Sequence, residues 1–247
     1  MKIQYFENHP EVQFDIDLIA RMVYAINKAV SVNIPQQLRE QPLETINYIA
    51  HMRGDWINEN LRRSVVTDGV DMVCFRRTSW RGRLLVDHRS QTSYSIASMD
   101  NLHRIPKKHR QHPHFLQTIL SVENAGYEGQ YSQMSFLPDV YSPEEYEYDY
   151  SEIFAGMLNP ASGYHHCVIA YNAEGDEITD IRLEFLDPHF YVVEEISLVE
   201  YIRPDFARLT EMDWDTETTE MPVETSKSLP QLKPAVVARL REVEKQG

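Results

Sequence analysis

The sequence predicts an α+β fold with mainly antiparallel strands and with helices packed on one side of the sheet or sheets. Two observations lead to this class. Segments with helical spacing of apolar residues alternate with groups of short segments rich in β-branched and aromatic residues. Connections of hairpin length join these short segments, which favours antiparallel pairing. The same helix-then-hairpin order occurs in both halves of the chain.

Two helices are expected at the start of the chain. Apolar residues recur at helical spacing within residues 11–31, and Pro35 is expected to end this segment. These apolar residues are Phe14, Leu18, Met22, Ala25 and Ile26. A second helix is expected from about residue 43 to residue 65.

Three short strands are expected next. They cover residues 69–77, 83–89 and 92–98, and the sequence Ser-Trp-Arg-Gly at 79–82 is expected to turn between the first two. Residues 99–113 form a polar, basic connection with room for a helical turn.

The second half is expected to repeat this order. One helix covers residues 114–126 and ends at Gly126, and a second covers residues 142–158. Ser142, Pro143 and Glu145 form a capping-box pattern at the start of the second helix. Strands are expected at residues 164–171, 178–186 and 190–195.

Residues 1–210 are expected to form a single α+β domain, or two lobes at about 1–126 and 127–210. The acidic, Thr-rich residues 211–229 are interpreted as a flexible linker. Residues 230–247 are expected to form a short C-terminal helix.

The composition predicts a globular protein of the cytoplasm. The chain has 247 residues, of which 42% are hydrophobic, so it can bury a sizeable core. Its two cysteines, Cys74 and Cys167, lie in apolar contexts without ligand spacing, which indicates reduced core thiols. No apolar run approaches the length that spans a bilayer, and the N-terminus does not resemble a signal peptide, so no membrane partner is expected.

Charge is distributed unevenly along the chain, whose net charge is −14. Residues 51–110 contain twelve Lys/Arg and six Asp/Glu, whereas residues 123–227 contain four Lys/Arg and twenty-four Asp/Glu. The middle of the chain could therefore approach a polyanion, and the acidic half could meet a basic partner. The alternative is that the two halves attract each other within the fold.

Arg53 and Asn60 are the first candidate binding residues. Both fall on the apolar face of the second predicted helix, where an arginine needs a partner because an isolated buried charge is costly. Arg53 is expected either to meet a carboxylate or carbonyl inside the protein or to face a ligand anion.

The tip of the first predicted hairpin is a second candidate binding site. Arg76, Arg77, Arg81 and Arg83 gather there around Trp80, and basic residues interleaved with an aromatic are typical of nucleic-acid contact. The alternative is a local cation–π stack of Arg81 on Trp80.

The loop at residues 101–114 is the third candidate, with four Lys/Arg and four His. Arg104, Lys107 and Lys108 could hold phosphates, and His103 and His109 are the candidate general acid and base. The alternative is a solvated surface loop without chemistry.

No metal or cofactor is expected. The histidines at 109, 112 and 114 lack a paired Cys or carboxylate, and His165 and His166 should point to opposite faces of a strand. The sequence contains no phosphate-binding glycine loop and no hydrolase or zinc-protease signature.

The acidic, tyrosine-rich helix at residues 143–154 suits a protein-binding face, because tyrosine is enriched at interfaces. Its apolar residues also have the spacing of an ordinary amphipathic helix.

Three hypotheses for function follow. The preferred one is a nucleic-acid-associated protein, such as a nuclease-like toxin or defence factor, that binds RNA or DNA through residues 51–114. The second is a non-enzymatic inhibitor, antitoxin or DNA mimic that binds a basic protein through residues 139–227. The third is a structural or regulatory module whose charges only complement each other.

Overall fold

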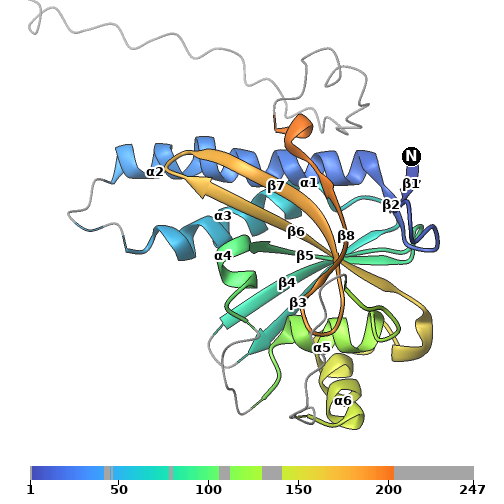
Figure 1. Cartoon of the computed structure of the whole chain (residues 1–247). Helices are drawn as coiled ribbons and strands as arrows, with labels where there is room; N and C mark the ends of the chain where they lie inside the picture. Colours follow the sequence, from blue (N-terminus) through green and yellow to red (C-terminus); the bar gives the residue numbers. More distant parts are fainter. Residues whose placement is uncertain are drawn as a thin grey trace, which may run out of the picture. The chain divides into compact units, whose positions relative to one another are not determined.

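A six-stranded sheet forms the centre of the computed structural model (Figure 1), which describes residues 2–41, 45, 47–77, 80–105, 112–129 and 141–202. The strand order is β3-β4-β5-β6-β7-β8, and neighbouring strands are antiparallel except for the central pair β5–β6. The strands are β3 (Val70–Arg77), β4 (Trp80–Asp87), β5 (Thr92–Ser98), β6 (His165–Glu174), β7 (Glu177–Leu186) and β8 (Val192–Ser197). The α+β class and the mainly antiparallel sheet are therefore confirmed.

The parallel pair β5–β6 joins the two halves of the sheet. Parallel neighbours need a crossover connection, and the described residues of the chain between these strands include three α-helices. They are α4 (Met99–Leu102), α5 (Phe115–Glu123) and α6 (Pro143–Phe154). Strands from both sides of residue 126, where two lobes could have met, belong to one sheet.

The N-terminal helices cover one face of the sheet. α1 (Ile16–Lys28) starts after Asp15, whose side chain accepts a hydrogen bond from the backbone N–H of Asp17 at 3.1 Å. A π-helical turn (Ala29–Asn33) leads into α2 (Ile34–Glu40), and α3 (Ile49–Ser64) packs against α1. The core under α1 and α3 includes Cys167 and Ile169 of β6. Two short strands, β1 (Ile3–Tyr5) and β2 (Gln13–Asp15), pair beside α1.

The other helices cover the opposite face, so the expectation that all helices pack on one side was wrong. Val168 and Ala170 alternate with the residues that face α1, and they pack against α4 and α5. α6 packs with α5 on β3 and β4. Because the central strands are apolar on both faces, both faces must be covered.

Among the boundaries that differ from the sequence prediction, two concern residues that were expected to end or interrupt an element. Pro35 does not end the first helical region, because it lies in the first turn of α2, a position that tolerates proline. Residues 80–82, expected in a turn, form the start of β4, where Trp80 pairs with Arg77.

The two cysteines are both free, but only Cys167 is a core residue as expected, since Cys74 is exposed on β3. No helix among the residues described is long and apolar enough to cross a membrane. The predicted linker at 211–229 and the terminal helix at 230–247 lie outside the described residues.

Candidate functional site

The arginines at the β3–β4 hairpin are divided between the two faces of the sheet. Arg76 pairs with Arg81, and Arg77 pairs with Trp80. Since consecutive side chains of a strand point to opposite faces, Arg76 and Arg81 share the face of Leu85, which packs toward α1. Arg77 and Trp80 lie on the α5–α6 face, so Arg81 does not stack on Trp80.

Trp80 and Arg77 hold the hairpin on α5 and α6. The ring of Trp80 lies 5.6 Å from that of Phe75 and 5.4 Å from that of Phe115, measured between centroids. Arg77 forms an ion pair with Asp149 of α6. Both side chains therefore have a structural role within the fold that needs no ligand, although 48% of the surface of Trp80 is exposed.

Asn60 has a structural role, whereas Arg53 is half-buried without a carboxylate. The buried amide of Asn60 donates to the backbone oxygen of Ala25 at 3.0 Å and to Oδ1 of Asn33 at 2.9 Å, which ties α3 to the first helices. Arg53 lies beside Tyr171 of β6, and its Nε is buried without a hydrogen-bond partner. None of the carboxylates in the described part of the chain forms an ion pair with Arg53.

The basic loop after α4 is described only at its start. His103 and Arg104 are exposed there, and Arg104 lies 4.0 Å from Asp100 in the preceding turn. Outside the described residues lie Lys107, Lys108 and His109. The pairing of His103 with His109 as acid and base therefore stays a prediction.

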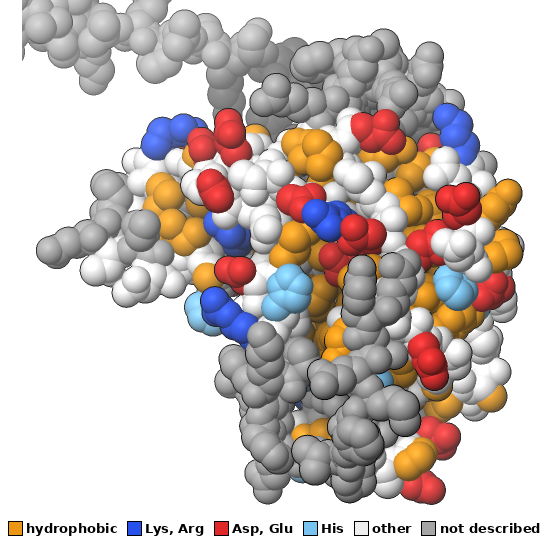
Figure 2. Space-filling view, viewed as in Figure 1, with side chains coloured by type: hydrophobic (Ala, Val, Ile, Leu, Met, Phe, Trp, Pro, Cys, Tyr) orange, Lys and Arg blue, Asp and Glu red, His pale blue; other side chains and the backbone are white. Residues whose placement is uncertain are grey.

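Charges of both signs are mixed on the face of the molecule in Figure 2, where Lys and Arg are scattered among Asp and Glu instead of forming one patch. Several arginines are neutralised within the fold. Arg182 of β7 lies 2.8 Å from Asp180 and 3.0 Å from Glu195. Their side chains are partly exposed, so these pairs contribute little to stability, but they reduce the basic charge available to a polyanion.

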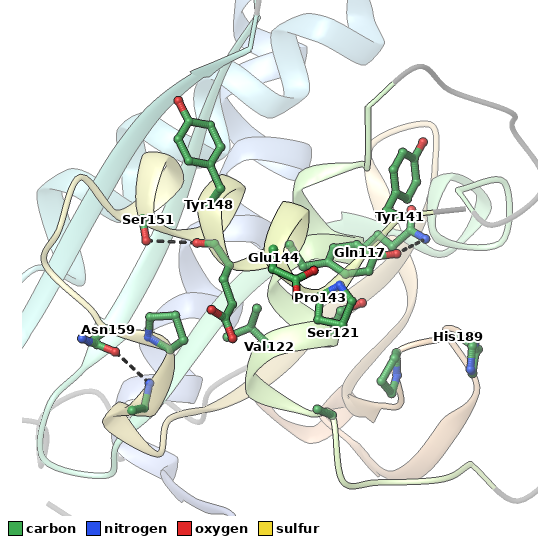
Figure 3. Close-up of a pocket in the computed structure, with 16 residues that line it drawn as sticks. Gln117, Ser121, Val122, Tyr141, Pro143, Glu144, Tyr148, Ser151, Asn159 and His189 are labelled. Carbon is green, nitrogen blue, oxygen red and sulfur yellow. Dashed lines mark hydrogen bonds between the residues drawn. The ribbon is translucent and has the colours of Figure 1, made fainter. Parts of the chain in front are cut away.

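A groove of about 1010 Å³ lies between α5 and α6 (Figure 3). Two turns complete its wall, the 3₁₀ turn η2 (Pro160–Ser162) and the turn at Pro188 and His189 that follows β7. The helices contribute Gln117, Ser121, Val122, Glu144, Glu147 and Ser151.

The lining of this groove combines aromatic, proline and acidic side chains. Its rings come from Tyr141, Tyr146, Tyr148, Pro143, Pro160 and Pro188. Tyr141 and Tyr146 contact each other edge to face, and Nε2 of Gln117 donates to the hydroxyl of Tyr146 at 3.1 Å. Glu144 and Glu147 supply two carboxylates, and the lining residues that the structure describes include no Lys or Arg.

The start of α6 sets the direction of these carboxylates. The predicted capping box is confirmed: Oγ of Ser142 accepts from the N–H of Glu145 at 3.3 Å, and the carboxylate of Glu145 accepts from the N–H of Ser142 at 2.7 Å. Glu145 is thus occupied by the cap, whereas Glu144 and Glu147, three residues apart, lie on the groove side of the helix. A hydrogen bond to its own backbone, followed by one to the Ser142 side chain, lowers the pKa of Glu144 and favours its anionic form.

A buried turn fixes the opposite wall. The carboxylate of Asp187 accepts hydrogen bonds from the N–H groups of His189 at 2.8 Å and Tyr191 at 2.9 Å. It also accepts from the N–H of Gly129 at 2.9 Å, which joins the segment after α5 to this turn. Asp187 is buried, so its hydrogen bonds position Pro188 and His189 firmly.

A chain of hydrogen bonds crosses the core beneath α5 and α6. The hydroxyl of Tyr150 donates to Oε1 of Glu123 at 2.6 Å, and the hydroxyl of Ser93 donates to Oε2 at 2.5 Å. The Ser93 oxygen also lies 2.6 Å from Nδ1 of His166, whose Nε2 lies 2.9 Å from the hydroxyl of Ser95. Burial raises the pKa of Glu123 to about 7 and lowers that of His166 to about 3.

These buried residues do not form a hydrolytic triad. In such a triad the acid orients the histidine that activates the serine, whereas here Glu123 contacts Ser93 and the second nitrogen of His166 contacts Ser95. All four residues are also buried, so a substrate cannot reach them. His165 and His166 do point to opposite faces as expected, with His166 buried and His165 half-buried.

Glu123, Ser93 and Ser95 were not among the residues predicted from the sequence. A signal was present in the sequence, because Ser93 and Ser95 alternate with Tyr94 and Ile96 along one strand, and Glu123 ends the apolar helix α5. In the part of the chain that the structure describes, no three His, Cys, Asp or Glu side chains are grouped as metal ligands.

Comparison with known proteins identifies a family but no characterised relative. No curated protein and no solved structure shows a significant match to the chain. One family model, described as a family of unknown function (DUF5986), matches residues 13–246, and the chain therefore belongs to this family.

Proposed function

We propose that this protein is an interaction module whose groove between α5 and α6 binds an extended, cationic segment of a partner protein. The observation that carries the proposal is the combination of two carboxylates with tyrosine and proline rings in one concave surface (Figure 3). A concave site with a few convergent polar groups is the usual form of a binding site.

The charges of the groove favour a positively charged ligand. Glu144 and Glu147 are both exposed, and with no Lys or Arg among the described lining residues they repel an anion. The guanidinium group of a partner arginine can donate two hydrogen bonds to a carboxylate, and its flat face can stack on a tyrosine ring. The net charge of −14 would also attract a basic partner over a longer range.

The contacts within the groove favour binding over catalysis. The hydroxyl of Ser151 donates to the backbone oxygen of Glu147 within its own helix, as exposed helical serines commonly do. Glu144 has a lowered pKa, which suits a permanent anion and not a general acid.

A fluorescence anisotropy titration with a labelled peptide of alternating Arg and Pro tests the proposal. We expect the Glu144→Gln/Glu147→Gln double variant to bind at least about tenfold more weakly, because each carboxylate contact to arginine contributes roughly 1 kcal/mol. Glu145 is left unchanged in this variant, since its replacement would remove one of the two hydrogen bonds of the helix cap.

The matched control is Glu152→Gln/Glu174→Gln, which removes the same charge from exposed residues outside the groove. It should bind like the wild type. Equal weakening in both double variants would show that only net charge matters and would contradict a groove site.

A second candidate function, association with RNA or DNA, is favoured by one observation on β3 and β4. Arg81 and Arg83 lie on the same face of β4, and Arg76 faces Arg81 across the hairpin. Arg81 is exposed, and no carboxylate of the described residues forms an ion pair with Arg81 or Arg83. Guanidinium groups along one strand suit a phosphate backbone.

A salt titration against labelled single-stranded RNA and DNA separates this candidate from the first. Arg81→Gln/Arg83→Gln should lower the dependence of affinity on salt concentration, since two phosphate contacts are removed. Arg62→Gln/Arg63→Gln is the control, because those exposed arginines of α3 pair with Glu59. No binding by the wild type at low salt would exclude the nucleic-acid function.

A further inference from the structure

The buried hydrogen-bond chain contains four groups that can each reverse the direction of their hydrogen bonds. Glu123 accepts when ionised and donates through one oxygen when protonated, and the hydroxyls of Ser93 and Ser95 do both. Neutral His166 carries its hydrogen on Nδ1 or on Nε2, and the other nitrogen accepts. The distances between successive groups are 2.5, 2.6 and 2.9 Å, so each contact is a hydrogen bond in either direction.

With Glu123 ionised, one arrangement satisfies every group. Ser95 donates to Nε2 of His166, Nδ1–H donates to Ser93, and Ser93 donates to Oε2 of Glu123. With Glu123 protonated, the same three contacts are satisfied in the opposite direction. Glu123 then donates to Ser93, Ser93 donates to Nδ1, and Nε2–H donates to Ser95.

We propose that Glu123, Ser93, His166 and Ser95 act as one proton-responsive unit, in which protonation of Glu123 reverses the chain and changes neutral His166 from its Nδ1–H to its Nε2–H tautomer. One hydrogen crosses each of the three hydrogen bonds. Ser95 gives its hydrogen to His166 and receives one proton that comes from the solvent. The unit therefore takes up one proton in total, and no bond between heavy atoms changes.

The groups around this hydrogen-bond chain are compatible with both arrangements. Tyr150 of α6 donates to Oε1 of Glu123, whereas Ser93 binds the other carboxylate oxygen, Oε2. The Tyr150 contact is therefore present in both states. No Lys or Arg of the described residues forms an ion pair with Glu123 to hold it ionised, and burial disfavours an imidazolium at His166. Glu123 also lies near Cys167 and Tyr164, whose pKa values are raised, so both stay neutral near pH 7.

The backbone around His166 is fixed, so the change is limited to hydrogens. The N–H of His166 donates to Oδ1 of Asn124 at 2.9 Å, and Nδ2 of Asn124 donates to the backbone oxygen of His166 at 2.9 Å. Ionised Glu123 holds Ser93 and Tyr150 by charge-assisted bonds, which are stronger than those of the neutral acid. Proton uptake therefore weakens the hydrogen bonds that Ser93 and Tyr150 form with Glu123 without breaking them.

The test is an NMR titration of the full-length protein with ¹⁵N-labelled histidine, from about pH 5.5 to about pH 9, in which the two neutral tautomers and the imidazolium have distinct ring-nitrogen shifts. We expect His166 to stay neutral and to pass from mainly Nε2–H at low pH to mainly Nδ1–H at high pH. A single tautomer throughout, or an imidazolium, would overturn the proposal.

Glu123→Gln is the matched variant, because its amide donates to Ser93 while its oxygen still accepts from Tyr150. It should hold His166 as Nε2–H at every pH, and a change of tautomer with pH in this variant would overturn the assignment to Glu123. If the variant does not fold, the wild-type titration decides alone. The readout needs no ligand, so its failure would leave the proposed groove function untouched.

Discussion

The hydroxyl of Tyr150 donates a hydrogen bond to Oε1 of Glu123 over 2.6 Å in the core beneath the groove. This contact joins the two helices that form the groove walls, since Tyr150 belongs to α6 and Glu123 ends α5. Glu123 is also bound by Ser93 of β5. The placement of α6 therefore depends on a buried polar contact as well as on the apolar packing of Ile153 and Phe154.

Tyr150→Phe should destabilise the fold by about 1–3 kcal/mol, because the Glu123 oxygen that accepted the hydroxyl is left without a donor in the core. The loss should be larger at pH 8 than at pH 6, since the ionised carboxylate needs the donor more. Urea unfolding at both pH values measures it. Tyr148→Phe is the control, because Tyr148 is 72% exposed, and equal losses in both variants would contradict the role of the buried bond.

Glu123→Gln should change how stability depends on pH. Burial raises the pKa of Glu123 from 4.5 to about 7, so folding takes up a proton in this window and the wild type loses stability as the pH rises through it. The variant lacks this loss. Its free energy of unfolding, relative to that of the wild type, should therefore rise by up to roughly 3 kcal/mol between pH 4.5 and pH 8.

The lowered pKa of His166 acts in the opposite direction, adding stability as the pH rises from about 3 toward 6.5. It is present in both proteins and cancels in their difference. Parallel stability curves for the wild type and Glu123→Gln would show that the carboxyl is not perturbed.

Asn124→Ala should be among the more destabilising single changes, at about 2–4 kcal/mol. The buried Asn124 amide donates to the backbone oxygens of His166 and Leu186 and accepts from the N–H of His166, so its removal leaves several buried groups without partners. Urea unfolding at neutral pH measures the loss, and a change below about 1 kcal/mol would mean that water replaces the amide.

Ser142→Ala should lower stability by about 1 kcal/mol through the loss of the α6 cap. Ser151→Ala, which removes an exposed hydroxyl from the same helix, should have almost no effect. Thermal melting of the two variants gives the comparison, and equal melting temperatures would contradict a stabilising cap.

The parts of the fold that depend on local sequence were predictable. The cap at Ser142 and the strand at 92–98 follow from short-range patterns, and the structure has both. The parallel pairing of β5 with β6 was not predictable, because it joins strands that are separated by 66 residues of the chain, between Ser98 and His165. The helices of that crossover connection cover the second face of the sheet, so the presence of helices on both faces was not predicted either.

The candidate site was less predictable than the fold. The acidic, tyrosine-rich α6 was noted in the sequence, but its groove also needs α5 and the turn after β7, which only the tertiary structure brings together. The predicted cluster of arginines around Trp80 does not form, because consecutive side chains of β3 and β4 point to opposite faces of the sheet.

The central claim is that the groove between α5 and α6 binds a cationic segment, and NMR mapping with the Arg-Pro peptide tests it most directly. Amide shifts should change mainly at Gln117, Val122, Glu147 and Ala161, which line the groove on three different elements. The changes should disappear in Glu144→Gln/Glu147→Gln. Shifts centred on the acidic residues of β7 and β8, with none in the groove, would contradict the account.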